Sequence, residues 1–314
     1  MTGLVASGLT DFLRSAVDPQ VQVDAIGIGA IYALMAVGIG LVFGVLRLVN
    51  FAYGQLVMAG AFALAFASDR DWPVWAGIVL CFAVVVALSM AMERVVFRPL
   101  RTQSAATMLV ATFAVAFLLQ AIALVIDQRD DTLGEPAASL ARLNLPWVIF
   151  GIDVRKITVV AIVTAAVCLL ALVLFLERTT VGLQMRAAAM DFQTARLLGV
   201  RANRVIGSAV LVSGILAAIV AVMLTVQQPL VTSTFALRET IVVLAGVVVG
   251  GMNRLLSATL GGFAIGYASG LLGGALPTEQ SQYLPSFLFG LVILTLLVRP
   301  GGLFTRGGGH VERV

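Results

Sequence analysis

Residues able to carry out covalent or metal chemistry are scarce in this chain. Its one histidine, His310, lies in a glycine-rich tail, and its two cysteines, Cys81 and Cys168, lie in separate apolar runs. Catalytic and metal sites need such groups in clusters, so the sequence predicts neither an enzyme nor a metal site. No GxxxxGK[ST] loop occurs in the sequence, so we do not expect the chain to bind nucleotide in that way itself. An intramembrane enzyme is the weakest alternative.

Without catalytic groups, the function that the sequence favours is binding. Charged side chains that could bind a partner are concentrated in one polar stretch, Thr179–Arg204. Four of the arginines lie in it, Arg178 precedes it, and Asp191 is its one acid. Apolar residues recur in it at helical spacing, Gly199 is a predicted helix end, and Asn203 is a predicted cap of the next helix. Two interpretations stay open: a solvated loop on the basic side of a membrane, or a short amphipathic helix that binds a partner.

The elements that must position this stretch are membrane helices. The chain has 314 residues, of which 60% are hydrophobic and 11% charged, against about 25% charged in soluble domains. We therefore predict an all-α, polytopic helical bundle with 8–9 spans of about 20 residues each. The net charge of +4 reports topology in such a protein, and no nucleic-acid partner is expected. The predicted spans are 22–45, 51–68, 73–92, 105–126, 157–176, 205–226, 235–250, 255–273 and 285–298.

The charges also predict an orientation. With the N-terminus outside, 13 of the 20 basic residues fall on the inner side, together with 4 of the 16 acids. This distribution obeys the positive-inside rule and places the C-terminus and Thr179–Arg204 in the cytoplasm. The seventh span is short and glycine-rich, which indicates a broken or re-entrant helix.

The transmembrane domain is predicted to cover residues 21–304. Residues 1–20 resemble an interfacial helix before it, and residues 305–314 form a cytoplasmic tail after it. Within the domain, the external loop 127–156 is acidic at its start. Its final part reads as a small hairpin that turns near Gly151 and Asp153.

Small residues recur every four positions in the later spans, which lets helix backbones approach closely in lipid. The candidate packing positions are Gly246, Gly250, Gly262, Gly266 and Gly270.

Polar side chains interrupt the first apolar region at Asn50, Tyr53 and Gln55. They are candidates for a translocation path, because polar groups at membrane depth usually face the bundle interior or a cavity. The alternative is an ordinary turn in which Asn50 caps the next helix. No predicted span carries an acid at its centre, as ion-coupled carriers usually require, so energy for transport is expected from another subunit. A stand-alone carrier or channel for a small polar solute is the main rival.

Several motifs, in one order, carry a family resemblance. The sequence reads Gly29-Ala-Ile-Tyr-Ala-Leu-Met-Ala-Val-Gly38, then Leu48-Val-Asn-Phe-Ala-Tyr-Gly54 and Glu93-Arg-Val95 with Arg98-Pro99. Later motifs are Arg186-Ala187, Leu197-Leu-Gly-Val200, Gly261-Gly262 with Gly266, and Arg299-Pro300 with Gly302-Leu-Phe304. From about Ala25 to Phe304 the chain resembles the permease subunit, of the LivH type, of bacterial branched-chain amino-acid ABC importers.

The resemblance implies a multi-pass protein of the bacterial inner membrane without a cofactor of its own. Its implied partners are a second permease, two ATPase subunits that bind ATP, a periplasmic substrate-binding protein, the lipid bilayer and a small-molecule substrate. The family's coupling helix, which docks on the ATPase, matches Thr179–Arg204. The ATPase-docking residues are then expected to be Arg186, Asp191, Leu197, Leu198 and Gly199.

The sequence also departs from the family's pattern. Tyr53 stands where the family usually has histidine, Asn253-Arg254 and Ser257 interrupt the glycine-rich loop, and Ser269 replaces an acid. These changes leave the expected fold intact but open the choice of substrate. Members of the family also carry urea, short amides and other small solutes, so urea or amide transport is a second alternative.

Overall fold

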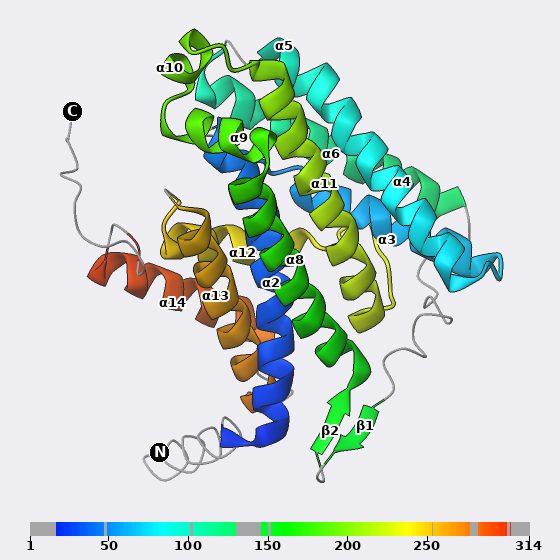
Figure 1. The fold of residues 1–314 in the computed structure, drawn as a ribbon. Coiled ribbons are helices and arrows are strands. Elements are labelled where there is room, and N and C mark those ends of the chain that lie inside the picture. The colour runs from blue at the N-terminus through cyan, green and yellow to red at the C-terminus, as the bar shows by residue number, and fades with distance from the viewer. Residues whose placement is uncertain are drawn as a thin grey trace.

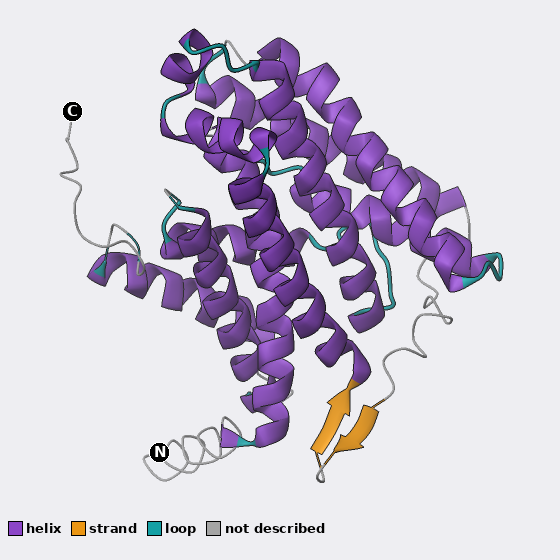
Figure 2. Ribbon diagram, in the orientation of Figure 1, coloured by secondary structure: helices purple, strands orange, loops and turns teal. Residues whose placement is uncertain are grey.

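The computed structural model describes residues 17–46, 49–100, 103–129, 146–149, 152–252, 254–276, 282–299 and 302. Helices make up almost all of these ranges (Figures 1 and 2). The elements are α2 (Pro19–Leu46), α3 (Tyr53–Asp69), α4 (Val74–Met92), η1 (Glu93–Phe97), α5 (Arg98–Leu100), α6 (Ala105–Arg129), β1 (Pro146–Ile149), β2 (Ile152–Arg155), α8 (Lys156–Arg178), α9 (Thr180–Met190), α10 (Phe192–Leu197), α11 (Ala202–Gln227), α12 (Leu237–Gly250), α13 (Leu255–Ala275) and α14 (Leu284–Val298).

Each predicted span contains a helix, and the all-α bundle is confirmed. Among the described residues, 6 helices are long and apolar enough to cross a membrane. The helices α3, α12 and α14 have 17, 14 and 15 residues, so at about 1.5 Å per residue they are shorter than a hydrocarbon core of about 30 Å. The full number of spans and the orientation of the termini therefore stay predictions. Residues 1–16 of the proposed interfacial segment and the tail 305–314 lie outside the described residues, while Pro19 and Gln20 already belong to α2.

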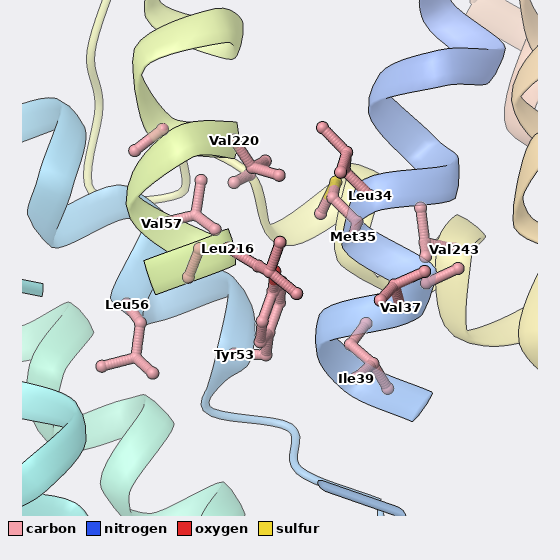
Figure 3. Packing of buried hydrophobic residues seen from close by; sticks show 14 of the residues in the cluster. Leu34, Met35, Val37, Ile39, Tyr53, Leu56, Val57, Leu216, Val220 and Val243 are labelled. Atoms are coloured by element: carbon pink, nitrogen blue, oxygen red, sulfur yellow. The ribbon is translucent and has the colours of Figure 1, made fainter. Parts of the chain in front are cut away.

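Helix α2 is the central helix of the bundle, and 83% of its most apolar window is buried. It packs against α13, α11 and α8. The buried cluster around it joins side chains from α2, α3, α11 and α12 (Figure 3). In contrast, only 17% of the corresponding windows of α6 and α8 is buried. Their exposed valines, leucines and isoleucines form an apolar outer surface, as expected for helices that face lipid.

The predicted packing glycines lie at two helix crossings. A Cβ atom added at Gly262 would lie 2.3 Å from Ala36 Cβ, and one added at Gly270 would lie 2.5 Å from Ala25 Cα. Both neighbours belong to α2. At the other crossing, a Cβ atom added at Gly250 would lie 2.1 Å from the carbonyl oxygen of Ser257 in α13. Larger side chains would hold these helices apart, so the small residues let α13 touch α2 on one face and α12 on another.

Helix α12 starts inside the bundle rather than at its edge. After α11 ends, residues 228–236 run without regular helix to the N-terminus of α12, and Ala236 adopts a left-handed conformation with φ 61°. Val231 and Phe235 of this segment are buried. Figure 1 shows the segment in yellow, rising from the lower end of α11 to α12 near mid-height of the bundle. This geometry agrees with the predicted broken or re-entrant character of the seventh span.

Two local features refine the sequence prediction. The predicted hairpin is confirmed, because β1 and β2 pair antiparallel with Trp147 opposite Val154 and Ile149 opposite Ile152. Asp153 therefore lies in a strand and not in the turn. Helix α4 does not end at Met92 but continues through the π-helical turn η1 and α5 to Leu100. No pattern in the sequence predicts this π-helical turn.

Candidate functional site

Two short helices, α9 and α10, connect the end of α8 to the start of α11. Thr179 caps α9, because its Oγ1 accepts a hydrogen bond of 3.0 Å from the amide of Gly182. The same hydroxyl donates to the carbonyl oxygen of Phe175 at 2.6 Å, which fixes α9 to the last turn of α8. We call residues 179–200 the α9–α10 unit; it lies at the upper end of the bundle in Figure 1.

Asp191 is the joint between the two helices. Its Oδ1 accepts a hydrogen bond of 3.1 Å from the amide of Thr194, and its Oδ2 accepts one of 2.5 Å from the Thr194 hydroxyl. The carboxylate thus caps α10 at its positive end, where an acid stabilises the helix dipole. Asp191 therefore orients α10, and any contact that it makes with a partner would be additional to this role.

The end of α10 agrees with the predicted helix stop. Gly199 has φ 91°, and the amide of Val200 donates to the carbonyl of Ala195 at 3.1 Å, which is the Schellman pattern. The predicted cap at Asn203 is wrong. Helix α11 begins at Ala202 with Arg201 in the cap position and no capping side chain, so Asn203 already lies within the helix.

The α9–α10 unit has one face on the bundle and one face exposed. Met185, Ala188 and Ala195 are 1%, 3% and 4% exposed and attach the unit to the bundle. Leu197 and Leu198 are 88% and 82% exposed. Other exposed residues of the unit include Leu183, Arg186, Met190, Asp191 and Gly199. Exposed leucines and an exposed arginine on one polar segment are typical of a surface that a partner covers.

The predicted path residues lie in the helix interfaces instead. Asn50 is 1% exposed, and its Oδ1 accepts a hydrogen bond of 3.1 Å from the amide of Ala52, just before α3. Figure 3 shows Tyr53 beneath Leu216, facing α2. Tyr53 occupies the space that glycine leaves at Gly38. Asn50 thus stabilises the turn before α3, as the structural alternative expected, but it does not cap the helix, because Ala52 is the N-cap residue and no side chain caps α3. A role of these residues in a path stays a prediction.

Two of these buried side chains nevertheless have unpaired polar atoms. Tyr53 and Gln55 are 0% and 1% exposed. Within the described ranges the hydroxyl of Tyr53, the Oε1 atom of Gln55 and the hydroxyl of Ser89 in α4 lack a hydrogen-bond partner. An unpaired buried polar group destabilises a fold by about 1–3 kcal/mol. None of these three residues lines the cavity described next.

A polar cavity of about 380 Å³ opens at the end of the bundle away from the α9–α10 unit. Thr158 and Leu288 in its wall are buried, whereas Arg238 and Gln228 are exposed, so the cavity leads from the surface into the bundle. Its lining comes from α2, β2, α8, α11, α12, α13 and α14. The polar lining residues are Asp24, Tyr32, Arg155, Thr158, Gln227, Gln228, Arg238, Glu239 and Ser269.

Charges of both signs face this cavity. Arg238 and Glu239 lie in the first turn of α12, while Asp24 lies on α2 and Arg155 ends β2. Glu239 accepts a hydrogen bond of 3.4 Å from Gln228, and Asp24 accepts one of 3.2 Å from Gln20. Across the described residues, no carboxylate oxygen lies within 4.0 Å of the Arg238 or Arg155 guanidinium. Both cations are therefore available to a ligand.

Sequence reasoning found part of this cavity without assembling it. Ser269 was recognised as a departure from the family's pattern. Tyr32, Arg238 and Glu239 were missed as site residues. A signal for the last two was present in the sequence, because Arg238 and Glu239 are charged residues at the start of the short seventh apolar run.

The cavity and the α9–α10 unit lie at opposite ends of two shared helices. Helix α8 contributes Thr158 to the cavity near its start and carries Thr179 at its end. With 23 residues it spans about 35 Å. Helix α11 runs back from the α9–α10 unit to Leu224 and Gln227 in the cavity wall. In the part of the chain that the structure describes, no cluster of three metal-ligating side chains occurs.

Solved structures share this fold. The chain matches PsaBC from Streptococcus pneumoniae, solved in complex with a Fab, with a TM-score of 0.52 and 13% identity over 93% of this chain and 97% of that one. It also matches an ABC transporter described as of the metal-chelate type, in an inward-facing conformation. That match has a TM-score of 0.53 and 17% identity, and it covers 95% of this chain and 99% of the other.

Sequence comparisons are more specific. The chain is 28% identical over 310 residues to the high-affinity branched-chain amino acid transport system permease protein LivH of Escherichia coli K12, covering 94% of this chain and 97% of that protein. BraD of Pseudomonas aeruginosa, with the same description, is 28% identical at the same coverage. The family model for the permease component of branched-chain amino acid transport systems matches residues 23–297. This chain therefore belongs to that family of membrane permeases and is not an enzyme.

Proposed function

We propose that this chain is the membrane-spanning subunit of an ATP-driven importer for branched-chain amino acids or a related small solute. It would lie in the bacterial inner membrane and pair with a second permease, with two ATPase subunits on its cytoplasmic side. A periplasmic binding protein would deliver the substrate. The family match over residues 23–297 and the two LivH and BraD relatives support this assignment.

The observation that carries the ATPase partnership is the exposed end of α10. Leu197 and Leu198 are more than four-fifths exposed, and they follow a helix that Asp191 caps and Gly199 ends. A helix fixed at both ends can transmit a push, whereas a flexible loop would absorb it. Arg186, exposed on α9, adds a positive charge to the same unit. We propose that a groove of the ATPase holds the α9–α10 unit.

The same geometry suggests how ATP use would move the substrate. A displacement of the α9–α10 unit acts on the end of α8 and on the start of α11, and both helices reach the polar cavity at their other ends. Closure of the ATPase subunits would thus change the cavity and expose it alternately to the two sides. Such coupling requires that the ATPase contact the inward- and outward-facing states differently.

Two alternatives lead to different measurements. A stand-alone carrier or channel would transport without ATP and would leave the exposed leucines of α10 without a partner. A permease of the same family for urea or short amides would use ATP but would not distinguish charged ends of its solute. The second alternative concerns only the substrate and leaves the coupling proposal unchanged.

The test is ATPase binding and solute-stimulated ATP hydrolysis in nanodiscs that contain the complete transporter. The variant Leu197→Asp with Leu198→Asp places two charges on the exposed end of α10 without touching the bundle. We expect the ATPase subunits to dissociate, or stimulated hydrolysis to fall to the unstimulated rate. The matched control is Leu230→Asp, since Leu230 is 58% exposed and lies in the segment after α11.

Asp191→Lys combined with Leu197→Asp extends the test to the joint between the helices. It removes the cap of α10 and also reverses a charge, so it should reduce coupling at least as much. If both double variants retain the ATPase and its stimulated hydrolysis, the docking proposal is wrong. The stand-alone carrier then becomes the better reading.

A further inference from the structure

The polar cavity has lining groups that no known activity of this chain assigns. Its volume of about 380 Å³ lies near the lower end of the range of about 300–1,000 Å³ for small-molecule sites. Two arginines and two acids line it, so its charges balance. Both arginines are exposed and both acids are half-buried, so the four charged groups lie where the cavity meets the surface and an entering solute would meet them.

One part of the cavity is suited to a carboxylate. The N-terminus of α12 opens into it, and no side chain in the described part of the chain caps this helix. Helix N-termini that begin within a membrane bundle bind anionic substrate groups through their free amides and dipole. Arg238 in the first turn adds a guanidinium that makes no ion pair with a described carboxylate, and Arg155 faces the same space from β2.

Other lining groups of the cavity are suited to an ammonium group and an apolar side chain. Asp24 and Glu239 supply the negative charges, and the hydroxyls of Tyr32 and Ser269 interact beside them. The remaining wall is aliphatic and includes Ile28, Leu224, Val242 and Leu288. A ligand that satisfied all three surfaces would carry a carboxylate, an ammonium group and a short branched hydrocarbon.

We infer that this cavity is a binding site within the permease for zwitterionic aliphatic amino acids. Arg238 and the N-terminus of α12 hold the carboxylate, Asp24 and Glu239 hold the ammonium group, and the aliphatic wall holds the side chain. This inference rests on the proposed transport function and names the substrate class and its recognition residues. It also means that the permease itself selects for charge, in addition to any selection by a binding protein.

A thiol-protection experiment tests the inference without using ATP. Ser269→Cys, in a chain with Cys81 and Cys168 replaced by alanine, is assembled with its partner subunits in nanodiscs. Methyl methanethiosulfonate labels the new thiol, and mass spectrometry measures the rate. At about ten times the dissociation constant, L-leucine occupies about 90% of the site and should slow labelling about tenfold. Equal concentrations of 4-methylpentanoate, which lacks the ammonium group, and of leucinamide, which lacks the carboxylate, should protect far less.

Arg238→Gln in the same background removes the cation and should weaken protection by L-leucine about 10- to 100-fold, because a hydrogen bond between charged groups is lost. Arg70→Gln is the matched control and should leave protection unchanged, since the Arg70 guanidinium donates to the Phe66 carbonyl, lies over the Phe66 ring and does not line the cavity. The inference is overturned if Ser269→Cys does not react, if the three compounds protect equally, or if Arg238→Gln protects like the control.

ATP-driven leucine uptake in proteoliposomes tests the proposed function separately. Uptake without protection would keep the importer and reject this site.

Discussion

The contact between α13 and α2 makes a quantitative prediction about Gly262. An added Cβ atom would lie 2.3 Å from Ala36 Cβ and 2.9 Å from the carbonyl oxygen of Tyr32. Carbon atoms pack at about 3.5–4.0 Å, so Gly262→Ala requires the two helices to separate by more than 1 Å. Backbone atoms and an alanine Cβ cannot rotate away as the end of a long side chain can.

The expected magnitude follows from two opposing effects. Overpacking a close contact destabilises a fold by about 1–3 kcal/mol, while replacing glycine by alanine inside a helix stabilises it by about 0.5–1 kcal/mol. The net loss for Gly262→Ala is therefore about 1–2 kcal/mol. At Gly44 and Gly207 an added Cβ atom meets nothing within 4 Å, so alanine there should be neutral or stabilising. We expect the thermal midpoint to fall by a few degrees in the first variant only.

The assay is the thermal stability of the purified chain in detergent, followed by fluorescence-detected size-exclusion chromatography. Gly44→Ala and Gly207→Ala are matched controls, because they make the same chemical change in α2 and α11. If Gly262→Ala is as stable as these controls, α13 does not touch α2 as closely as described. The argument that small residues set this crossing would then be wrong.

Three further predictions concern single contacts. Asp191→Ala should destabilise α10 by about 1 kcal/mol, seen as faster hydrogen exchange of its amides, and Asp191→Asn should retain most of the protection. Gly199→Ala forces a side chain into a left-handed conformation and should cost about 1–2 kcal/mol, measured by the same exchange without loss of the bundle. Ser213→Ala removes the hydrogen bond of 2.7 Å from the Ser213 hydroxyl to the Gly38 carbonyl, and its thermal midpoint should fall by the equivalent of about 1 kcal/mol.

Much of this fold was predictable because lipid imposes a simple rule on sequence. Apolar runs long enough to span gave the helices and their order, and Trp147 to Arg155 gave the hairpin. The apolar runs could not show whether a helix continues past the end of its run, or at which level in the bundle a helix starts. The π-helical turn after Met92 depends on packing against neighbouring helices. The level at which α12 starts depends on the left-handed conformation of Ala236. Because this residue is an alanine and not a glycine, the sequence does not indicate that conformation.

The candidate site likewise has one part that could be predicted from the sequence and one part that could not. The α9–α10 unit was visible from the sequence, since a polar segment between apolar helices contrasts with its surroundings. The polar cavity was not, because Asp24, Glu239 and Ser269 come from three helices that only the fold brings together. Tyr53 and Gln55 were also singled out by their polarity alone. The structure packs them between helices and not against the cavity, and their role in a path stays a prediction.

The π-helical turn η1 has a consequence for how α4 stays in phase with its neighbours. Every fourth residue of this long helix is buried, namely Gly77, Cys81, Val85, Ser89, Glu93 and Phe97. In a regular α-helix a four-residue spacing advances about 400° per step, so such a stripe drifts about 40° at each interval. The wider turn from Glu93 to Phe97 rotates the chain by less per residue, so it opposes this drift and helps to keep Phe97 on the buried side. Deleting one residue there would rotate Arg98–Leu100 by about 100° relative to the bundle. The length of this short segment therefore matters more than the identity of its residues, and it should tolerate a substitution better than a deletion or an insertion.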